Sequence, residues 1–146
     1  DKVMEHIKDA REKGGKVVLG GEPHERGGNF VQPTLIVNAS QDMEFCVEET
    51  FGPLAALFRF NDEADVIRQA NDTEFGLAAY FYARDLSRAF RVAEALEYGM
   101  VGINTGLIST EVAPFGGMKS SGLGREGSKY GIEEYVEIKY LCLGGI

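Results

Sequence analysis

Between residues 54 and 103 the spacing of apolar residues alternates between strand and helix periods, and this alternation restricts the fold more than any other feature. Residues 54–60 form a nearly continuous apolar run, typical of a strand buried on both faces. A helical pattern follows, then a strand pattern over 78–83, a longer helical pattern and a strand pattern over 100–103. This order predicts an α/β fold with a parallel sheet.

Polar residues and glycines predict where the helices begin and end. Asn61 is a candidate N-cap for the first helix of this region, and Asp85 for the second, which Gly99 would end. Near the start of the chain, helical spacing without a cap in front predicts a helix that is already under way at residue 1 and ends at Gly14–Gly15. A short strand over 16–19 and an extended segment over 30–37 are expected after it.

The last third of the chain has a different character. Residues 104–131 are dense in glycine and lack a regular period, and such long irregular stretches in compact folds are usually functional. Residues 133–143 alternate again, which predicts a strand that needs a partner edge, and an edge on another subunit is one candidate. One side of this strand would present Val136, Ile138, Tyr140 and Cys142.

Composition argues against several classes of function. A net charge of −8 disfavours nucleic-acid binding, which needs a basic face. No apolar run approaches the ~20 residues of a membrane span, and the first residues do not form a secretory signal. Cys46 and Cys142 cannot make a disulfide framework and share no metal-ligand spacing with His6 or His24. We therefore expect a cytoplasmic protein with no metal site and two buried, structural thiols.

Two short motifs have competing interpretations. The run of residues 122–127 matches G-x-G-x-x-G, but no buried strand precedes it, so we interpret it as a tight loop whose glycines adopt positive φ. The segment Glu48–Pro53 places two acids before an aromatic-Gly-Pro turn. An acid held there could accept hydrogen bonds from sugar hydroxyls, and the alternative is an exposed acidic turn.

Three segments in register resemble the aldehyde dehydrogenase family: Glu48–Pro53, Asn71–Ala79 and Asn104–Gly127. The resemblance covers nearly the whole chain. It implies that residues 1–131 are the C-terminal part of the family's catalytic α/β domain and that residues 132–146 are its oligomerisation strand. It also implies a small-molecule aldehyde substrate, NAD or NADP as cofactor, and a homo-oligomer, either a dimer or a tetramer.

The resemblance also implies roles for single residues. Glu49 is similar to the family's acid that hydrogen-bonds the nicotinamide ribose, and Phe51 to the aromatic residue beside the nicotinamide ring. Leu77 would lie near the same end of the cofactor. Phe115 would form a wall of the aldehyde pocket, and Asn104 would fix the loops around that pocket.

The loop of residues 106–114 and the segment 127–135 resemble the succinate-semialdehyde branch of the family. In that branch a serine helps to bind the distal carboxylate of the substrate, and Ser109 matches it. The implied activity is oxidation of succinate semialdehyde, or a similar short aldehyde acid, to the carboxylate.

The family's catalytic cysteine and its glutamate base belong to segments upstream of this chain, so no catalytic residue is assigned here and the chain alone is expected to be inactive. Three alternatives stay open. The parent could be a glutarate-semialdehyde or broad aldehyde enzyme, or the chain could be a non-catalytic assembly module. An independent enzyme using Cys46 is disfavoured, because nearby glutamates oppose a thiolate.

Overall fold

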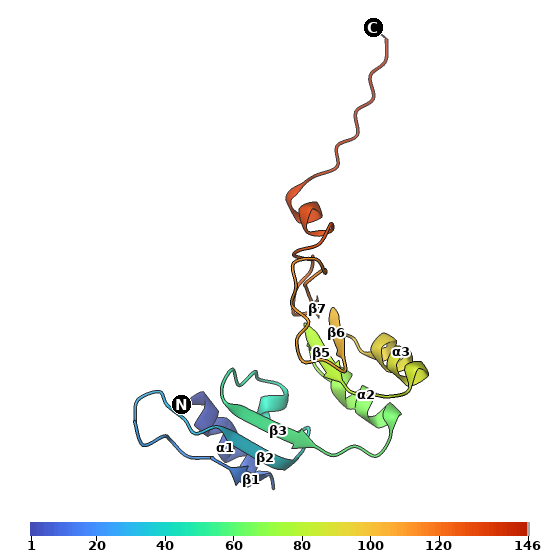
Figure 1. Cartoon of the computed structure of the whole chain (residues 1–146). Helices are drawn as coiled ribbons and strands as arrows, with labels where there is room; N and C mark the ends of the chain where they lie inside the picture. Colours follow the sequence, from blue (N-terminus) through green and yellow to red (C-terminus); the bar gives the residue numbers. More distant parts are fainter. Residues whose placement is uncertain (146) are drawn as a thin grey trace. The chain divides into compact units, whose positions relative to one another are not determined.

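The computed structural model describes residues 1–145 and has a mixed α/β architecture with parallel strands, which confirms the predicted class. The chain divides into two compact units with a boundary between Thr73 and Glu74, and each unit is described by itself (Figure 1). The predicted division at residue 131 rests on the family's assembly strand and stays a prediction.

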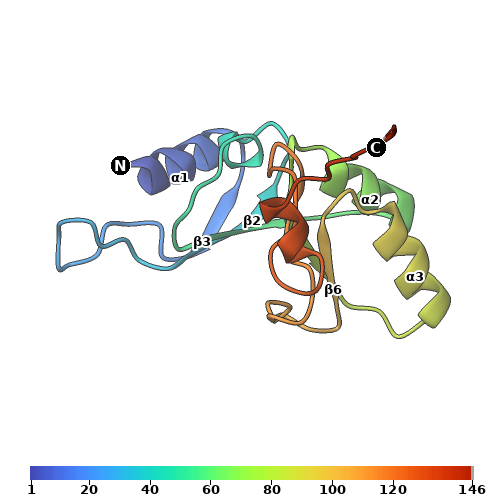
Figure 2. The ribbon, with the colours of Figure 1, turned by 90° about the horizontal axis from the view of Figure 1, so that it is seen from above.

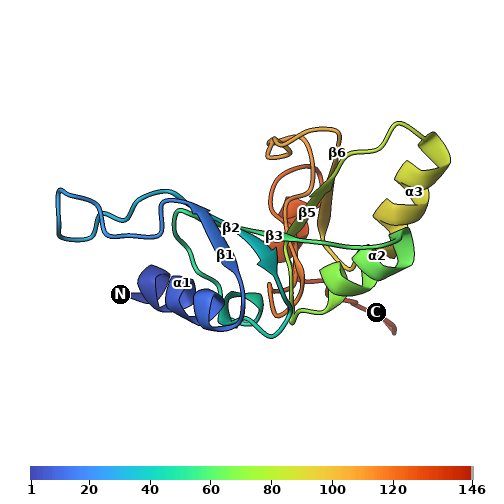
Figure 3. The same ribbon diagram turned by 90° about the horizontal axis from the view of Figure 1, so that it is seen from below.

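The first unit is a three-stranded sheet with helices. The sheet order is β1-β2-β3, with β1 antiparallel to β2 and β2 parallel to β3. Its elements are α1 (Lys2–Glu12), β1 (Lys16–Leu19), β2 (Thr34–Ala39), the 3-10 turn η1 (Glu44–Cys46), β3 (Leu54–Phe58) and α2 (Glu63–Asn71). Helix α1 lies alongside the three strands, as Figures 2 and 3 show from opposite sides.

The core of this unit lies between α1, the sheet and the start of the β2–β3 connection. Ile7, Ala10, Ile36 and Met43 are fully buried there. The prediction that β3 is buried on both faces is wrong for this chain. Burial alternates along β3, and Leu57 is 51% exposed, because α1 and η1 contribute to the core on one side only.

The helix caps confirm one prediction and correct another. Asp85 caps α3 (Leu86–Ala95) by accepting a hydrogen bond from the backbone N–H of Arg88 at 2.7 Å. At α2 the cap is Asp62, whose side chain accepts from the N–H of Asp65 at 2.9 Å, and not Asn61. Asp62 has the extended backbone of an N-cap and is directly followed by the first helical residue.

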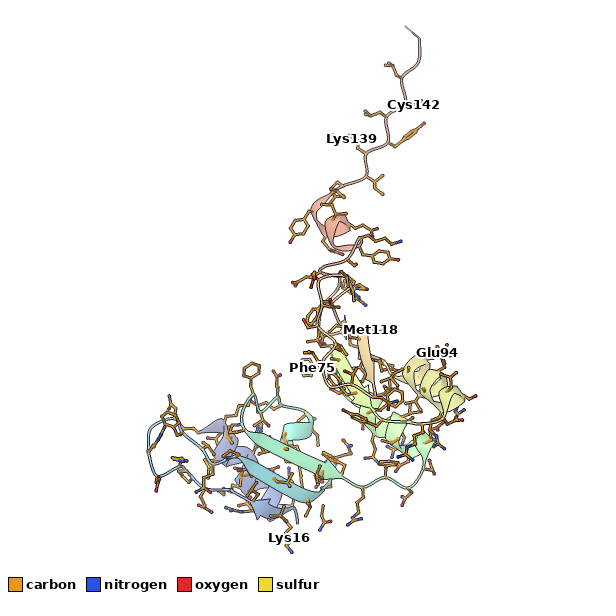
Figure 4. All side chains as sticks on the ribbon, viewed as in Figure 1. Lys16, Phe75, Glu94, Met118, Lys139 and Cys142 are labelled. Atoms are coloured by element: carbon orange, nitrogen blue, oxygen red, sulfur yellow. The ribbon has the colours of Figure 1, made fainter. Side chains whose placement is uncertain are left out.

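The second unit contains two small sheets. Strands β5 (Ala78–Phe81) and β6 (Met100–Ile103) pair in parallel, with α3 as the connection between them. Strands β4 (Phe75–Gly76) and β7 (Met118–Lys119) pair antiparallel, and Figure 4 labels Phe75 and Met118 on this pair.

The glycine-rich run after β7 is a tight loop, as predicted. Gly122, Gly124 and Gly127 have φ values of +102°, +83° and +66°, which residues with a Cβ rarely adopt. The run lies between β7, a strand of only two exposed residues, and the 3-10 turn η2 (Gly131–Tyr135). Residues 118–135 therefore lack the buried strand and the long helix that a dinucleotide fingerprint needs before and after its glycines.

The end of the chain is exposed. Residues 133–135 belong to η2 rather than to a strand, and residues 136–145 have no strand partner within the described chain. Cys142 is exposed, which corrects the expectation of a buried thiol, because no element among residues 1–145 packs against it (Figure 4). Pairing of this tail with another subunit stays a prediction. No helix in the described part of the chain is long and apolar enough to cross a membrane.

Candidate functional site

The predicted cofactor residues Glu49 and Phe51 lie in a short loop between η1 and β3, in the first unit. We call residues 48–53 the acidic loop. Its end is fixed by hydrogen bonds, because the N–H of Thr34 donates to the Pro53 carbonyl at 2.8 Å. The side chain of Glu49 is exposed, and that of Phe51 is 90% exposed. The loop therefore presents a carboxylate and an aromatic ring to solvent on a backbone tied to β2.

Phe51 has an unusual backbone conformation. Its φ is +45°, in the left-handed region, where a residue with a Cβ loses about 1–2 kcal/mol relative to the right-handed region. Surrounding contacts must hold such a residue in place, and residues of this kind are enriched at ligand sites. The strain supports the interpretation of the acidic loop as a binding feature rather than as a relaxed surface turn.

Helix α1 holds the residues on either side of Glu49. The Lys2 ammonium group lies 2.7 Å from a carboxylate oxygen of Glu48, and its hydrogen bond lowers the pKa of Glu48 below the ordinary value. Nδ1 of His6 lies 2.9 Å from the hydroxyl oxygen of Thr50. Both contacts tie the acidic loop to one face of α1.

His6, Glu44 and Glu48 also gather one potential ligand atom each within 4.8 Å of one another. The sequence spacing did not show this cluster, because the three residues come from different elements. Glu48 is already paired with the Lys2 ammonium group, whose positive charge would oppose a metal ion at the same carboxylate. We interpret the group as a salt-linked cluster, and the expectation of no metal site stays a prediction.

A pocket of about 330 Å³ lies in the second unit. It brings together two predicted site residues, because Leu77 and Phe115 both line it. Phe115 is held by paired backbone hydrogen bonds with Glu126, of 2.9 Å and 2.7 Å. The other lining residues are Gly116, Gly117, Ser121, Leu123, Gly124, Arg125, Glu126, Glu134 and Tyr135.

Arg125 also lines the pocket and was not predicted from the sequence. One of its guanidinium nitrogens donates to the carbonyl oxygens of Gly117 and Gly124, at 2.9 Å and 2.6 Å, and so ties the residue before β7 to the glycine-rich run after it. The signal was a single arginine within a run of glycines, where a side chain with several donors can organise a backbone that has few side chains of its own.

Ser109, the predicted substrate residue, is exposed in the irregular segment after β6 and does not line the pocket. Asn104, at the start of that segment, behaves as expected for a residue that fixes loops: its side chain bonds both backbone groups of Ala83. Glu49 and Phe51 belong to the first unit, and Leu77, Ser109 and Phe115 to the second.

Comparison with known proteins identifies the family. The model of the aldehyde dehydrogenase family matches residues 1–141. The chain belongs to this family.

Among individual aldehyde dehydrogenases, the chain is 76% identical to the NADP-dependent succinate-semialdehyde dehydrogenase of Escherichia coli, over 98% of this chain and 30% of that protein. It is 72% identical to a glutarate-semialdehyde dehydrogenase of Pseudomonas aeruginosa, over 99% of this chain and 30% of that protein. A crystal structure of an NADP-dependent E. coli enzyme superposes with a TM-score of 0.95 at 76% identity, over 98% of this chain and 30% of that chain. The chain thus spans about 30% of the length of the relatives it matches.

The local chemistry of Cys46 is not that of a nucleophile. Its thiol is partly buried and lies 3.4 Å from the carbonyl oxygen of Ser40, to which it donates. Burial raises the pKa of the Cys46 thiol, and the charge of Asp42 raises it further. A thiol held in its neutral form attacks carbonyl groups poorly, which agrees with the structural role expected for Cys46.

Proposed function

We propose that the protein containing this chain is an NAD- or NADP-dependent aldehyde dehydrogenase that oxidises a short aldehyde with a carboxylate at its far end. Succinate semialdehyde is the proposed substrate, and glutarate semialdehyde, with one more methylene, is the alternative. The observation that supports this most strongly is the 76% and 72% identity to relatives named for these two substrates. One methylene is worth only about 1–3 kcal/mol in discrimination, so we expect both compounds to react, at different rates.

In this proposal the acidic loop holds the nicotinamide end of the cofactor. The Glu49 carboxylate accepts hydrogen bonds from the ribose hydroxyls, the Phe51 ring lies beside the nicotinamide, and Leu77 contacts the same end. When bound, the nicotinamide accepts a hydride from the substrate. An exposed carboxylate and an exposed ring on a tied loop suit this role, because they keep the ribose in one orientation.

The substrate side of the proposal uses two residues of the second unit. Phe115 forms an apolar wall of the aldehyde pocket, and its half-buried ring already lines a pocket in this chain. The Ser109 hydroxyl donates a hydrogen bond to the distal carboxylate of the substrate. The nucleophilic cysteine and the glutamate base are proposed to lie outside these 146 residues.

The substrate class is tested with the full-length protein. Initial rates are measured with succinate semialdehyde, glutarate semialdehyde and butanal, each with NAD and with NADP. We expect the two acids to have a kcat/KM well above that of butanal. We expect Ser109→Ala to lower kcat/KM for the acids by about tenfold, the loss for a hydrogen bond to a charged group, with butanal unaffected. Ser87→Ala, at an exposed serine of α3, is the matched control. Equal rates with butanal would reject the acid-specific class.

The role of Glu49 is tested by Glu49→Gln, which keeps the shape and removes the charge. We expect slower turnover without a change in thermal unfolding, because the side chain is exposed. Glu94→Gln, at an exposed glutamate of α3, controls for the loss of a surface charge. Turnover equal to that of the parent would remove Glu49 from the cofactor site.

The 146-residue chain by itself is expected to produce no reduced cofactor from succinate semialdehyde with either NAD or NADP. The control is Cys46→Ser. If the chain does turn over substrate and Cys46→Ser abolishes the reaction, Cys46 is the nucleophile and the assignment of the chemistry to other segments is wrong.

A second role, in assembly, is favoured by the exposed tail. Ile138 is 100% exposed and Tyr140 is 84% exposed, and the alternating pattern of residues 136–143 suits addition to a sheet edge of another subunit. We infer a cytoplasmic homo-oligomer, a dimer or a tetramer, in which residues 132–146 are the assembly segment and its extended part after η2 pairs with another subunit. Light scattering on the full-length protein with and without these residues tests this, and an unchanged mass would contradict it.

A further inference from the structure

Three alternate residues around Glu49 contact the same helix. Glu48 is paired with Lys2, and Thr50 is hydrogen-bonded to His6. Gly52 lies so close to α1 that a Cβ added there would be 2.5 Å from a methyl carbon of Val3. Between these anchored positions, Glu49 and Phe51 remain exposed. The contacts therefore alternate along the acidic loop. Residues 48, 50 and 52 contact α1, and the side chains of Glu49 and Phe51 between them are accessible to a ligand.

His6 is the most rigid of these anchors. Its side chain is 1% exposed, its ring packs edge-on against Phe45 with centroids 6.5 Å apart, and Nδ1 is bonded to Thr50. A side chain that is buried, packed and hydrogen-bonded has few available rotamers, so the atom it bonds is placed accurately. Lys2 is 43% exposed and on a flexible stem, so it can supply charge but less positional accuracy.

The chemistry of His6 also indicates a role other than core stability. The residue is next to the fully buried Ile7. Its buried Nε2 lies 3.9 Å from a carboxylate oxygen of Glu48, too far for a hydrogen bond, and has no hydrogen-bond partner among the described residues. A buried polar atom without a partner is unfavourable, and an apolar side chain of similar size would avoid that cost. What an apolar side chain could not provide is the hydrogen bond to Thr50, directly beside Glu49.

We propose that His6 is a positioning residue for Glu49, acting through the hydroxyl group of Thr50. The inference rests on the proposed function, in which Glu49 binds the cofactor ribose. Loss of the His6–Thr50 hydrogen bond lets the acidic loop move away from α1, and the Glu49 carboxylate then no longer holds the ribose in the orientation needed for hydride transfer. Helix α1, remote in sequence from the loop, is in this way part of the cofactor site.

The first test uses the full-length protein and two variants that break the bond from opposite sides. Thr50→Val removes the hydroxyl group with little change in shape, and His6→Leu removes the ring. Both are expected to lower kcat by about tenfold to a hundredfold, as expected for a displacement on the order of 1 Å at a reacting centre, with KM for the aldehyde unchanged. His6→Asn, which restores a polar atom at the place of Nδ1, is expected to recover most of the loss. His24→Leu is the matched control at a half-exposed site.

A double-mutant cycle distinguishes positioning from a general effect on folding. In the Glu49→Gln background, Thr50→Val is expected to have no further effect on kcat, because the group that it positions is already lost. Additive effects of the two substitutions would overturn the proposal. Thr50→Val alone is informative if His6→Leu fails to fold, since Thr50 is not in the core.

A second test does not depend on catalysis. In the full-length protein, amide hydrogen exchange over residues 48–52 is expected to be faster in His6→Leu and Thr50→Val than in the parent or in His24→Leu. Unchanged exchange in both variants would show that the bond does not fix the loop and would overturn the proposal. The kinetic results distinguish the positioning role of His6 from the cofactor role of Glu49. If Glu49→Gln slows turnover and Thr50→Val does not, only the positioning role fails. If Glu49→Gln has no effect, the proposed cofactor role of the loop fails first.

Discussion

Asn104 and Ala83 are joined by two hydrogen bonds of 2.8 Å: the Asn104 side chain accepts from the Ala83 N–H and donates to the Ala83 carbonyl oxygen. Asn104 follows β6 and Ala83 follows β5, so the pair extends the contact between these parallel strands beyond their last residues. The amide group of the side chain makes the two hydrogen bonds that the backbone of one more paired strand residue would make. The irregular segment that contains Ser109 starts from this fixed point.

This pair allows a test with two substitutions. Asn104 has a φ of +58°, which glycine tolerates and alanine does not. Both Asn104→Gly and Asn104→Ala lose the two hydrogen bonds, but we expect Asn104→Ala to lower the free energy of unfolding by about 1 kcal/mol more than Asn104→Gly. Urea denaturation of the 146-residue chain measures the difference. If Asn104→Ala had the same free energy of unfolding as Asn104→Gly, or a higher one, the backbone would not be constrained at this position.

A substitution at Phe51 is expected to lower turnover with little change in the free energy of unfolding. Phe51→Gly relieves the positive φ but adds flexibility to the unfolded chain, so the free energy of unfolding should stay within about 1 kcal/mol of the parent. Turnover by the full-length protein should fall, because the proposed contact of the ring with the nicotinamide is lost. The matched variant Phe30→Gly removes another exposed ring, and we expect normal turnover from it. Unchanged turnover in Phe51→Gly would reject the cofactor role of the ring.

Core packing in the first unit is expected to depend on Ile36 far more than on Leu57, its near neighbour across the sheet. Ile36 is fully buried and Leu57 is 51% exposed. We expect Ile36→Ala to lower the free energy of unfolding by about 2–5 kcal/mol, and Leu57→Ala by well under half as much. Denaturant unfolding of the chain compares the two. Similar losses would mean that the exposed side of β3 is covered in solution.

The pairing of Asp9 with Lys13 predicts how stability responds to acid. The hydrogen bond from Lys13, at 2.6 Å, lowers the pKa of Asp9 below its ordinary value of 3.8, and the backbone N–H of Glu44 lowers it further. Because the pKa is lower in the folded state, the stabilising contribution is complete above pH 3.8 and is lost as the pH falls through the lower folded value.

Asp9→Asn should therefore be less stable than the parent near neutral pH, and the difference should shrink at pH 3 and below. Urea unfolding at several pH values checks this, with Glu25→Gln, in the exposed loop after β1, as the control. A difference that grows in acid would show that the sign of the pKa shift is wrong.

Local periodicity predicted most of the elements, because helix and strand spacing depends on neighbouring residues. The strand over 100–103, the short strand over 16–19 and the Asp85 cap were all confirmed. The cap of α2 was misplaced by one residue, since two polar residues in a row, Asn61 and Asp62, are equally acceptable by type.

Burial was predicted less well than secondary structure. The apolar run of β3 and the apolar side of the final segment both indicated buried residues, yet Leu57 and Cys142 are exposed. A side chain is buried only if another element lies over it, and the pattern of one strand does not determine which element that is.

The candidate site was predicted through family resemblance more than through spacing. Leu77 was expected beside the cofactor and Phe115 in the wall of the aldehyde pocket; both line one pocket, and their roles stay predictions. Arg125 and His6 were not predicted, because their roles depend on contacts with carbonyl or hydroxyl groups that come from other segments. Such contacts leave no regular pattern in the sequence.

The parallel pairing of β2 and β3 has a consequence for the order in which the first unit folds. Residues 40–53 are not a local turn. Because β2 and β3 are parallel, this connection must return from the end of β2 to the edge where β2 begins, so that Leu54 can pair with Thr34. Closing such a connection is entropically unfavourable until the two strands dock, and non-local pairings of this kind slow folding. We expect α1 to form early and the acidic loop to become ordered only when β3 joins the sheet. A nascent or partly unfolded chain would then keep its helix but lack an ordered acidic loop. Under the proposed function, such a chain could not yet bind the cofactor.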